Sequence, residues 1–224
     1  MTPDEALAAL HELADPVRAE GMAAYHKVLR PYLGIPVPVL TDLAKGWREG
    51  LSTEARVALA DGLWQSNIHE ARVAAAKLLT QARIPGDEPV WQLIASWVPG
   101  FDAWAIADHA CDAGGRRLVA DPSRLDQVEG WVTHDSLWVR RAALVITLPW
   151  TKQNFPKPED LAIRDRVLGW AATLADDRDW FIQKSIAWWL RDLSKHDAPR
   201  AGAFLTAHGD RLKPFARKEA SKYL

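Results

Sequence analysis

Trp104 and Asp108 lie four residues apart in a stretch whose pattern predicts a helix. That spacing places both side chains on one helix face, close enough to contact the same ligand. An indole face attracts cations, and a carboxylate stabilises positive charge that develops beside it. The pair therefore has the chemistry to bind a cationic group. The structural alternative is a packed tryptophan beside an aspartate that pairs with a neighbouring arginine.

Two later stretches combine tryptophan with arginine. Trp138 is followed by Arg140 and Arg141, and Trp188 is followed by Arg191. A guanidinium group binds phosphate through two parallel hydrogen bonds, which makes arginine the usual choice for phosphate recognition. We expect these two stretches and the Trp104 stretch to face one cleft. The alternative is that the arginines cover tryptophan rings at the surface.

Helices must position these residues, because strand-like alternation is absent and alanine and leucine dominate between frequent prolines and glycines. We expect an all-α chain. Arg72, Arg140 and Gln183 occupy equivalent places when the stretches 68–79, 137–144 and 181–188 are superimposed. A period of roughly 34–45 residues indicates HEAT-like helical repeats, which stack into a solenoid with a concave surface. No linker interrupts the pattern, so we expect one solenoid domain over residues 1–224.

Composition limits the classes of function. The hydrophobic fraction of 48% and the charged fraction of 25% are those of a soluble protein. No apolar run is long enough to span a bilayer, and the N-terminus lacks a signal pattern. The single cysteine, Cys111, excludes an internal disulfide and a cysteine-based zinc site. We therefore expect a cytoplasmic protein that does not bind membranes.

Charge is divided unevenly along the chain. Residues 1–134 hold 12 Lys and Arg against 18 Asp and Glu, and residues 135–224 hold 16 against 11. The two parts therefore carry −6 and +5, although the whole chain carries only −1. A basic C-terminal part can contact phosphates even when the whole chain is nearly neutral. Solvated helix faces with uneven charge are the alternative.

Familiar catalytic motifs are missing. The sequence has no glycine-rich dinucleotide loop, no phosphate-binding Walker loop, no His-Glu-x-x-His and no Gly-x-Ser-x-Gly. The seven histidines are scattered without the spacing of metal ligands. We expect no cofactor and no metal.

Four stretches, in this order, resemble the AlkD-type DNA alkylation-repair glycosylases over most of the chain. Residues 25–35 resemble the family's tyrosine helix and the Leu-Gly-Ile turn that follows it. Trp104 and Asp108 match the first and last positions of a Trp-Asp-x-x-Asp motif, and Ala105 stands where the family often has an acid. An orienting role at that position is therefore lost or passes to Asp102. The third and fourth stretches are 137–143 and 181–191, and the segment 216–220 also resembles the family's C-terminal segment.

The resemblance implies a HEAT-like solenoid with a concave DNA-binding face and a DNA glycosylase that removes N3- and N7-alkylated purines from duplex DNA. It also implies that the lesion stays within the duplex. Asp108, Trp104, Trp188 and Arg141 are then the candidate catalytic residues. The protein is expected to act as a monomer. Candidate DNA-binding residues are Tyr25, Arg140, Lys152, Lys184, Arg191 and Lys218.

The reaction suits these side chains. Alkylation at N3 or N7 makes the purine cationic and a good leaving group, so no strong general acid is needed. Cleavage builds positive charge on the sugar, which Asp108 would stabilise and the two indoles would flank. A HEAT-like module that binds DNA without cutting it is the first alternative. A protein-binding scaffold is the second.

Overall fold

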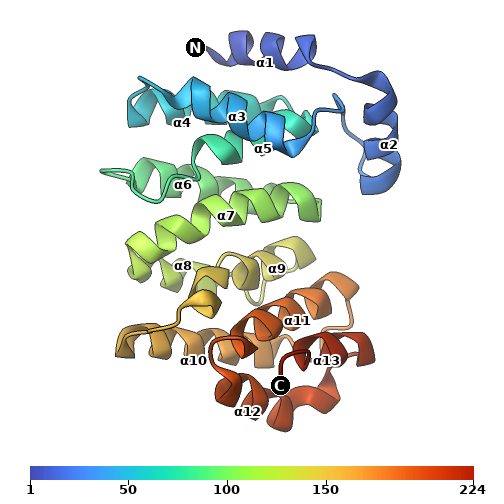
Figure 1. Cartoon of the computed structure of the whole chain (residues 1–224), viewed down its shortest axis with the longest axis vertical. Helices are drawn as coiled ribbons and strands as arrows, with labels where there is room; N and C mark the ends of the chain where they lie inside the picture. Colours follow the sequence, from blue (N-terminus) through green and yellow to red (C-terminus); the bar gives the residue numbers. More distant parts are fainter. The chain divides into compact units, whose positions relative to one another are not determined.

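The computed structural model describes residues 1–224 and contains helices but no strands, which confirms the all-α class (Figure 1). The chain folds into two compact units, Met1–Ala120 and Asp121–Leu224. None of the helices combines the length and apolarity needed to cross a membrane.

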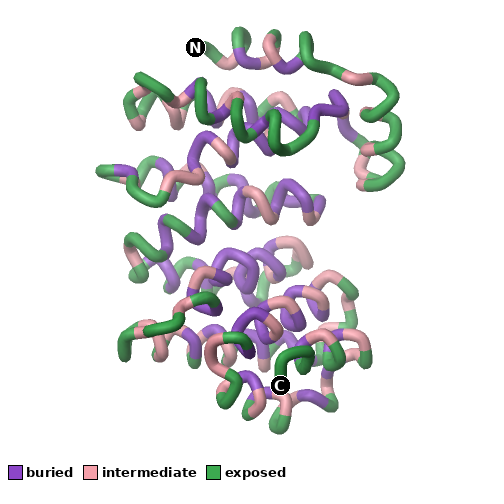
Figure 2. Tube along the Cα trace, in the orientation of Figure 1, coloured by how far each residue is buried: buried purple, intermediate pink, exposed green.

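The first unit is built around α5, which packs mainly on three other helices, α3, α4 and α7. Small side chains allow this close packing, because Ala71, Ala74 and Ala75 of α5 are completely buried. Helix α2 is the exception in this unit, since none of its residues is buried (Figure 2). The unit contains α1 (Pro3–Glu12), α2 (Pro16–His26), α3 (Val37–Arg48), α4 (Thr53–Gln65), α5 (His69–Leu78), α6 (Glu88–Trp97), η1 (Val98–Gly100) and α7 (Trp104–Ala120).

The second unit is built around α11, which packs on α9, α12, α13 and η3. Trp189 of α11 is fully buried, and its indole Nε1 donates to Thr147 Oγ1 at 3.2 Å. The unit contains η2 (Pro122–Arg124), α8 (Leu125–Glu129), α9 (Leu137–Val145), η3 (Leu148–Lys152), α10 (Pro158–Thr173), α11 (Trp180–Ser194), α12 (Ala198–His208), η4 (Gly209–Arg211) and α13 (Pro214–Ala220).

Local sequence explains where many helices begin. Thr2 and Glu5 form a capping box at α1, and Pro3 occupies the first turn, where its missing N–H costs nothing. Asp15 accepts hydrogen bonds from the amides of Val17 and Arg18 at the start of α2. Such caps provide hydrogen-bond acceptors for amides that have no partner within the helix. Each capped helix therefore begins at a defined residue.

The aligned positions of the repeats make the same contact. Arg72 Nε donates to the carbonyl of Trp64 at 3.1 Å, eight residues earlier. Gln183 Nε2 donates to the carbonyl of Ala175 at 2.9 Å, also eight residues earlier, and Arg140 donates to the carbonyl of His134 at 2.7 Å. Each side chain thus reaches back to the end of the preceding helix or the loop that follows it, where carbonyls lack helical partners. This shared contact supports the alignment of the three repeats.

Candidate functional site

Helix α7 begins at Trp104 and places Asp108 one turn further on. Both side chains are half-buried, whereas the intervening Ala105, Ile106 and Ala107 are buried. Helix α7 packs with this buried side against α5 and α6. The indole and the carboxylate therefore lie at the margin of the first unit's core, partly open to solvent.

Two aromatic side chains from α2 contact Trp104. The Tyr25 ring meets the indole edge-on, with 6.1 Å between ring centroids, and the His26 ring lies 5.5 Å away. Tyr25 is 69% exposed, so its ring forms the outer side of this group. Edge-to-face pairs of this kind are typical of aromatic packing. The predicted DNA-binding residue Tyr25 and the predicted catalytic residue Trp104 are thus neighbours.

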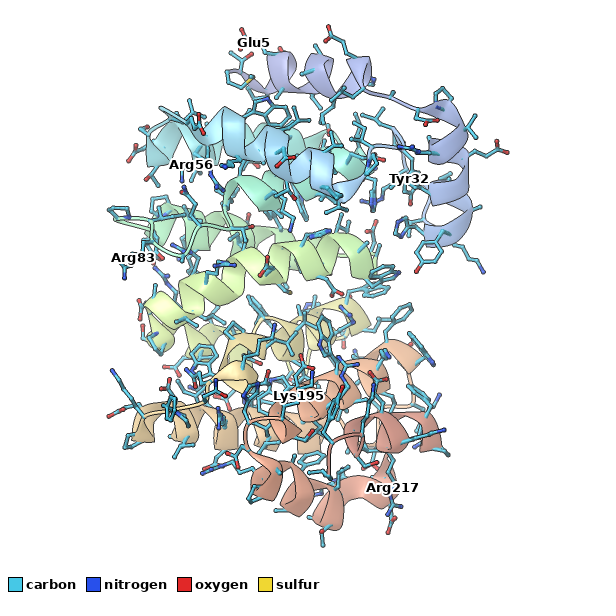
Figure 3. The ribbon with its side chains drawn as sticks, in the orientation of Figure 1. Glu5, Tyr32, Arg56, Arg83, Lys195 and Arg217 are labelled. Carbon is cyan, nitrogen blue, oxygen red and sulfur yellow. The ribbon has the colours of Figure 1, made fainter.

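A second layer lies behind these rings. His26 stacks on Tyr32 with 5.8 Å between centroids and 2° between planes, and His69 lies 4.5 Å from His26 and 5.0 Å from Tyr32. Figure 3 shows Tyr32 between α2 and the helices beside it. Sequence reasoning missed this layer, because no local spacing links residues 26, 32 and 69.

The histidines of this region are neutral at pH 7. The pKa of His69 is lowered to about 3, mainly by burial and in smaller part by electrostatic repulsion from neighbouring basic groups, which include Arg30. Burial also lowers the pKa of His109, one residue after Asp108, to about 4. For His26 burial is again the main cause of a lowered pKa, although the carboxylate of Glu70 opposes it. The imidazoles therefore add no positive charge beside Trp104.

The turn that leads out of α2 is fixed by a buried carboxylate. Glu70, at the start of α5, accepts hydrogen bonds from the amides of Leu33 and Gly34 at 2.9 and 2.8 Å. Gly34 has φ +77°, a conformation that favours glycine, and a Cβ there would lie 2.3 Å from the Asp15 carbonyl oxygen. The start of α2 thus lies against this turn. An open apolar groove lies beside this contact, lined by Arg18, Gly21, Met22, Tyr25, Gly34, Ile35, Pro36 and Val37.

A buried arginine joins the chain after α2 to the chain before α7. The guanidinium of Arg30 donates to a carboxylate oxygen of Asp102, two residues before Trp104. The Arg30 side chain is 1% exposed and the Asp102 side chain 46%. Position 105 is buried, so an acid there would need a partner of its own. Sequence reasoning considered Asp102 for an orienting role but missed Arg30, which lies 72 residues away.

In the second unit, Arg141 and Trp188 lie on α9 and α11. Arg141 is only 4% exposed, so a phosphate would have to approach α9 closely to contact it. Trp188 is half-buried, and its Nε1 donates to Asp192 Oδ2 at 3.0 Å. That hydrogen bond fixes the orientation of the indole. The predicted tryptophan is therefore held by a carboxylate of its own helix.

The predicted DNA-binding cations fall into two groups. Arg140 donates to Asp177 at 2.9 and 3.0 Å, and Lys184 and Arg191 each contact Glu219 at 2.5 Å. These contacts favour structural roles for the three cations. The second group contains exposed lysines without an ion pair: Lys152 and Lys218.

A group of aromatic rings lies near the start of α11; the sequence pointed to Trp138 but not to the contacts that join these rings. The Trp138 and Phe181 centroids are 4.7 Å apart, and Trp180 stacks on Phe215 at 5.6 Å with 20° between planes. Trp180 is 49% exposed. No local sequence signal separates these rings from core aromatics, because helical spacing is the same for both.

The donor chemistry of the chain is limited. No group of three or more His, Cys, Asp or Glu side chains is placed to hold a metal ion. What the first unit offers is the half-buried Asp108 carboxylate, an indole one turn away and neutral imidazoles, a group that can stabilise a cation. The other acid on α7, Asp112, is exposed and lies 4.0 Å from Arg116.

Comparison with known proteins agrees with the helical fold. No curated protein is similar enough in sequence to match. A predicted DNA alkylation repair enzyme from Enterococcus faecalis has a similar solved structure, with a TM-score of 0.78, 24% identity and coverage of 94% of this chain and 96% of that one. AlkD2 from Streptococcus mutans gives a TM-score of 0.63, 20% identity and coverage of 85% and 91%. Both likenesses confirm the AlkD-type helical-repeat fold.

The family assignment rests on sequence. The model of one family, described as DNA alkylation repair enzyme, matches residues 6–224, which is nearly the whole chain. The four motif stretches that suggested the resemblance all lie within the matched region. This chain belongs to the DNA alkylation repair enzyme family.

Proposed function

We propose that the protein is a DNA glycosylase that excises N3- and N7-alkylated purines from duplex DNA. The observation that carries the proposal is the arrangement on α7, where Asp108 and Trp104 lie one turn apart and half-buried beside the exposed ring of Tyr25. Membership of a DNA alkylation repair family supplies DNA as the partner and repair as the process.

The reaction proceeds by separation of charge. The glycosidic bond between N9 of the alkylated purine and C1′ breaks, and its electron pair leaves with the base, which becomes neutral. Positive charge develops on the sugar, and water adds to C1′ and releases a proton. Asp108 stabilises the sugar cation and positions the water. Trp104 attracts the cationic base through its ring face, a contact worth about 0.5–2 kcal/mol depending on desolvation.

The remaining residues have supporting roles in this proposal. His26 and His69 are neutral, so they do not repel the cationic base. Trp188 supplies a second indole, and Arg141 contacts a phosphate of the damaged strand. Tyr25, Lys152 and Lys218 contact DNA through their exposed side chains. A cytoplasmic location and a monomeric state stay predictions, and size-exclusion chromatography with light scattering tests the second.

The decisive experiment measures release of N7-methylguanine from duplex DNA by the wild type and by Asp108→Asn. We expect the rate to fall about 10²–10³-fold while DNA affinity is retained, because an amide cannot stabilise the developing cation. Asp112→Asn is the matched control, since Asp112 is half-exposed one turn further along the same helix. Equal release by Asp108→Asn and the wild type would remove Asp108 from the mechanism, and no release by either would remove the enzyme activity.

A second candidate is a module that binds DNA without cutting it. Ala105 favours this candidate, because the position after Trp104 is both uncharged and buried. It predicts lesion-independent binding with steep salt dependence and no free base. A protein-binding scaffold, the third candidate, predicts no DNA binding even at low salt.

A further inference from the structure

Arg30 is an unusual residue to bury. Its side chain is 1% exposed, and its one described hydrogen bond goes from Nη2 to Asp102 Oδ2. The Nε and Nη1 groups are buried and have no hydrogen-bond partner. A guanidinium carries five N–H donors, and buried donors without partners weaken the folded state. An apolar side chain of similar length would fill the same space without that cost, so stability alone does not explain Arg30.

The location of the pair suggests another purpose. Arg30 follows the end of α2 by four residues, and Asp102 precedes Trp104 by two. Contacts between Trp104 and the last residues of α2, Tyr25 and His26, join the same two segments. The ion pair and the aromatic contacts therefore hold the same two segments together, the end of α2 and the start of α7. Of the two kinds of contact, the charged hydrogen bond is the one with a defined geometry.

The charge of Arg30 has a second effect on this junction. It lowers the pKa of both His26 and His69, in each case in addition to burial. The carboxylate of Asp102 is half-exposed, so the pair presents its negative member to solvent and keeps its positive member inside. Trp104 thus begins a helix whose entry is flanked by an anion and by neutral rings.

We propose that Arg30 and Asp102 are a positioning pair that holds the first turn of α7, and with it the Trp104 indole, in the geometry that the glycosylase reaction needs. This proposal rests on the proposed function. Neither residue is a catalytic residue, because each acts through Trp104. The pair orients Trp104 from outside α7. Within the helix, position 105 is a buried alanine and has no polar group for that role.

The test compares Asp102→Asn, Arg30→Met and the double variant in base-release kinetics. We expect each single variant to lower kcat at least tenfold with little change in KM. DNA binding is distributed over many contacts, whereas the orientation of the Trp104 indole depends on this one pair. The double variant should be no slower than the slower single variant, since both substitutions break one interaction. Asp102→Glu, which keeps the carboxylate, should recover most of the rate.

The control variant is Asp87→Asn. Asp87 pairs with Arg117 at 2.9 Å, and Arg117 is completely buried near the other end of α7. This substitution breaks an ion pair that also has a buried arginine, and Arg117 lies on α7 about 20 Å from Trp104 by helical rise. It should lower the melting temperature and leave kcat unchanged. A kcat loss in Asp87→Asn as large as in Asp102→Asn would mean that general destabilisation explains both.

A second readout does not require activity. Protein labelled with 5-fluorotryptophan gives a ¹⁹F resonance for each indole, and Trp104→Phe identifies the one from Trp104. We expect Asp102→Asn to shift or broaden that resonance and Asp87→Asn to leave it in place. An unmoved resonance together with an unchanged kcat overturns the proposal. If the wild type releases no base, the proposed function fails, and the resonance alone then decides the positioning role. If Arg30→Met does not fold, Asp102→Asn carries both readouts.

Discussion

At the residue scale, the main electrostatic feature of the first unit is a group of histidines kept neutral by burial. His69 is 4% exposed, and its ring lies among those of His26 and Tyr32. A neutral imidazole can pack against an aromatic ring, whereas a protonated one would repel a cationic base. The same burial that suits the proposed reaction makes the fold sensitive to acid.

Acid should therefore destabilise the protein through these side chains. The pKa of His69 is 6.5 in the unfolded chain and about 3 in the folded one, and that of His109 falls to about 4. As the pH falls, the histidines of the unfolded state bind protons before those of the folded state do. The contribution of neutral His69 and His109 to the free energy of unfolding is therefore fully present above pH 6.5, and it is lost as the pH falls towards the folded pKa values. The loss is about 1.4 kcal/mol per pH unit for each histidine.

Urea unfolding at pH 7.0, 6.0 and 5.0 measures this effect. His109→Gln should show a smaller dependence of the unfolding free energy on pH than the wild type, by about one proton. His11→Gln is the control, because His11 is exposed in the last turn of α1. A wild-type stability that stays constant between pH 7 and 5 would contradict the neutral, buried state of the histidines.

At the element scale, α2 depends on its end contacts, because none of its residues is buried. The turn that follows it is held by Glu70, and Gly34 allows the chain to pass close to Asp15. Helix α2 carries Tyr25, so these contacts also determine where the Tyr25 ring meets Trp104. Stability of the turn and geometry of the site are thus linked.

Substitution of Gly34 tests the link. Gly34→Ala places a methyl group 2.3 Å from the Asp15 carbonyl and 2.7 Å from the Ala19 amide, in a left-handed conformation. Gly50→Ala has nearly the same φ, +76°, but no atom lies within 4 Å of its Cβ. Both variants lose about 1–2 kcal/mol from the backbone conformation. Gly34→Ala should lose more in calorimetry and also lower the rate of base release, and equal losses would exclude the steric contact.

The sequence predicted the helices better than it predicted which side chains from different helices contact one another. The spacing of Trp104 and Asp108 was enough to place them one turn apart, because helical geometry is local. Arg30 and Asp102 are 72 residues apart, and the partners of Lys184 and Arg191 come from a different helix. Such pairs depend on how helices pack, which the charge pattern of one stretch does not reveal. For the same reason the sequence did not show that Arg140, Lys184 and Arg191 pair with acidic side chains.

At the scale of the whole molecule, side chains join neighbouring repeats at separations close to the repeat period. Arg164 contacts Asp197, 33 residues later, Arg200 contacts Asp165 across 35, and Trp189 contacts Thr147 across 42. These intervals agree with the roughly 34–45 residues expected from the sequence. Most arginines of the second unit are used in such contacts. Much of its positive charge is therefore paired with acidic side chains, whereas Lys152 and Lys218 are exposed without an ion pair.

This distribution predicts which cations set the salt dependence of DNA binding. Each phosphate contact contributes about −0.9 to the slope of log K against log salt concentration on duplex DNA. Lys152→Ala and Lys218→Ala should each reduce the steepness of that slope by about one. Lys184→Ala should reduce it less, because Lys184 is already paired with Glu219 at 2.5 Å.

Lys45→Ala is the matched control, because Lys45 is an exposed lysine on α3 and its loss changes the net charge by the same amount. Fluorescence anisotropy of a labelled duplex between 50 and 200 mM salt measures all four slopes. If Lys45→Ala flattens the slope as much as Lys152→Ala does, net charge alone governs binding. In that case the exposed lysines of the second unit do not form a specific contact surface, and the pairing of Lys184 has no bearing on DNA affinity.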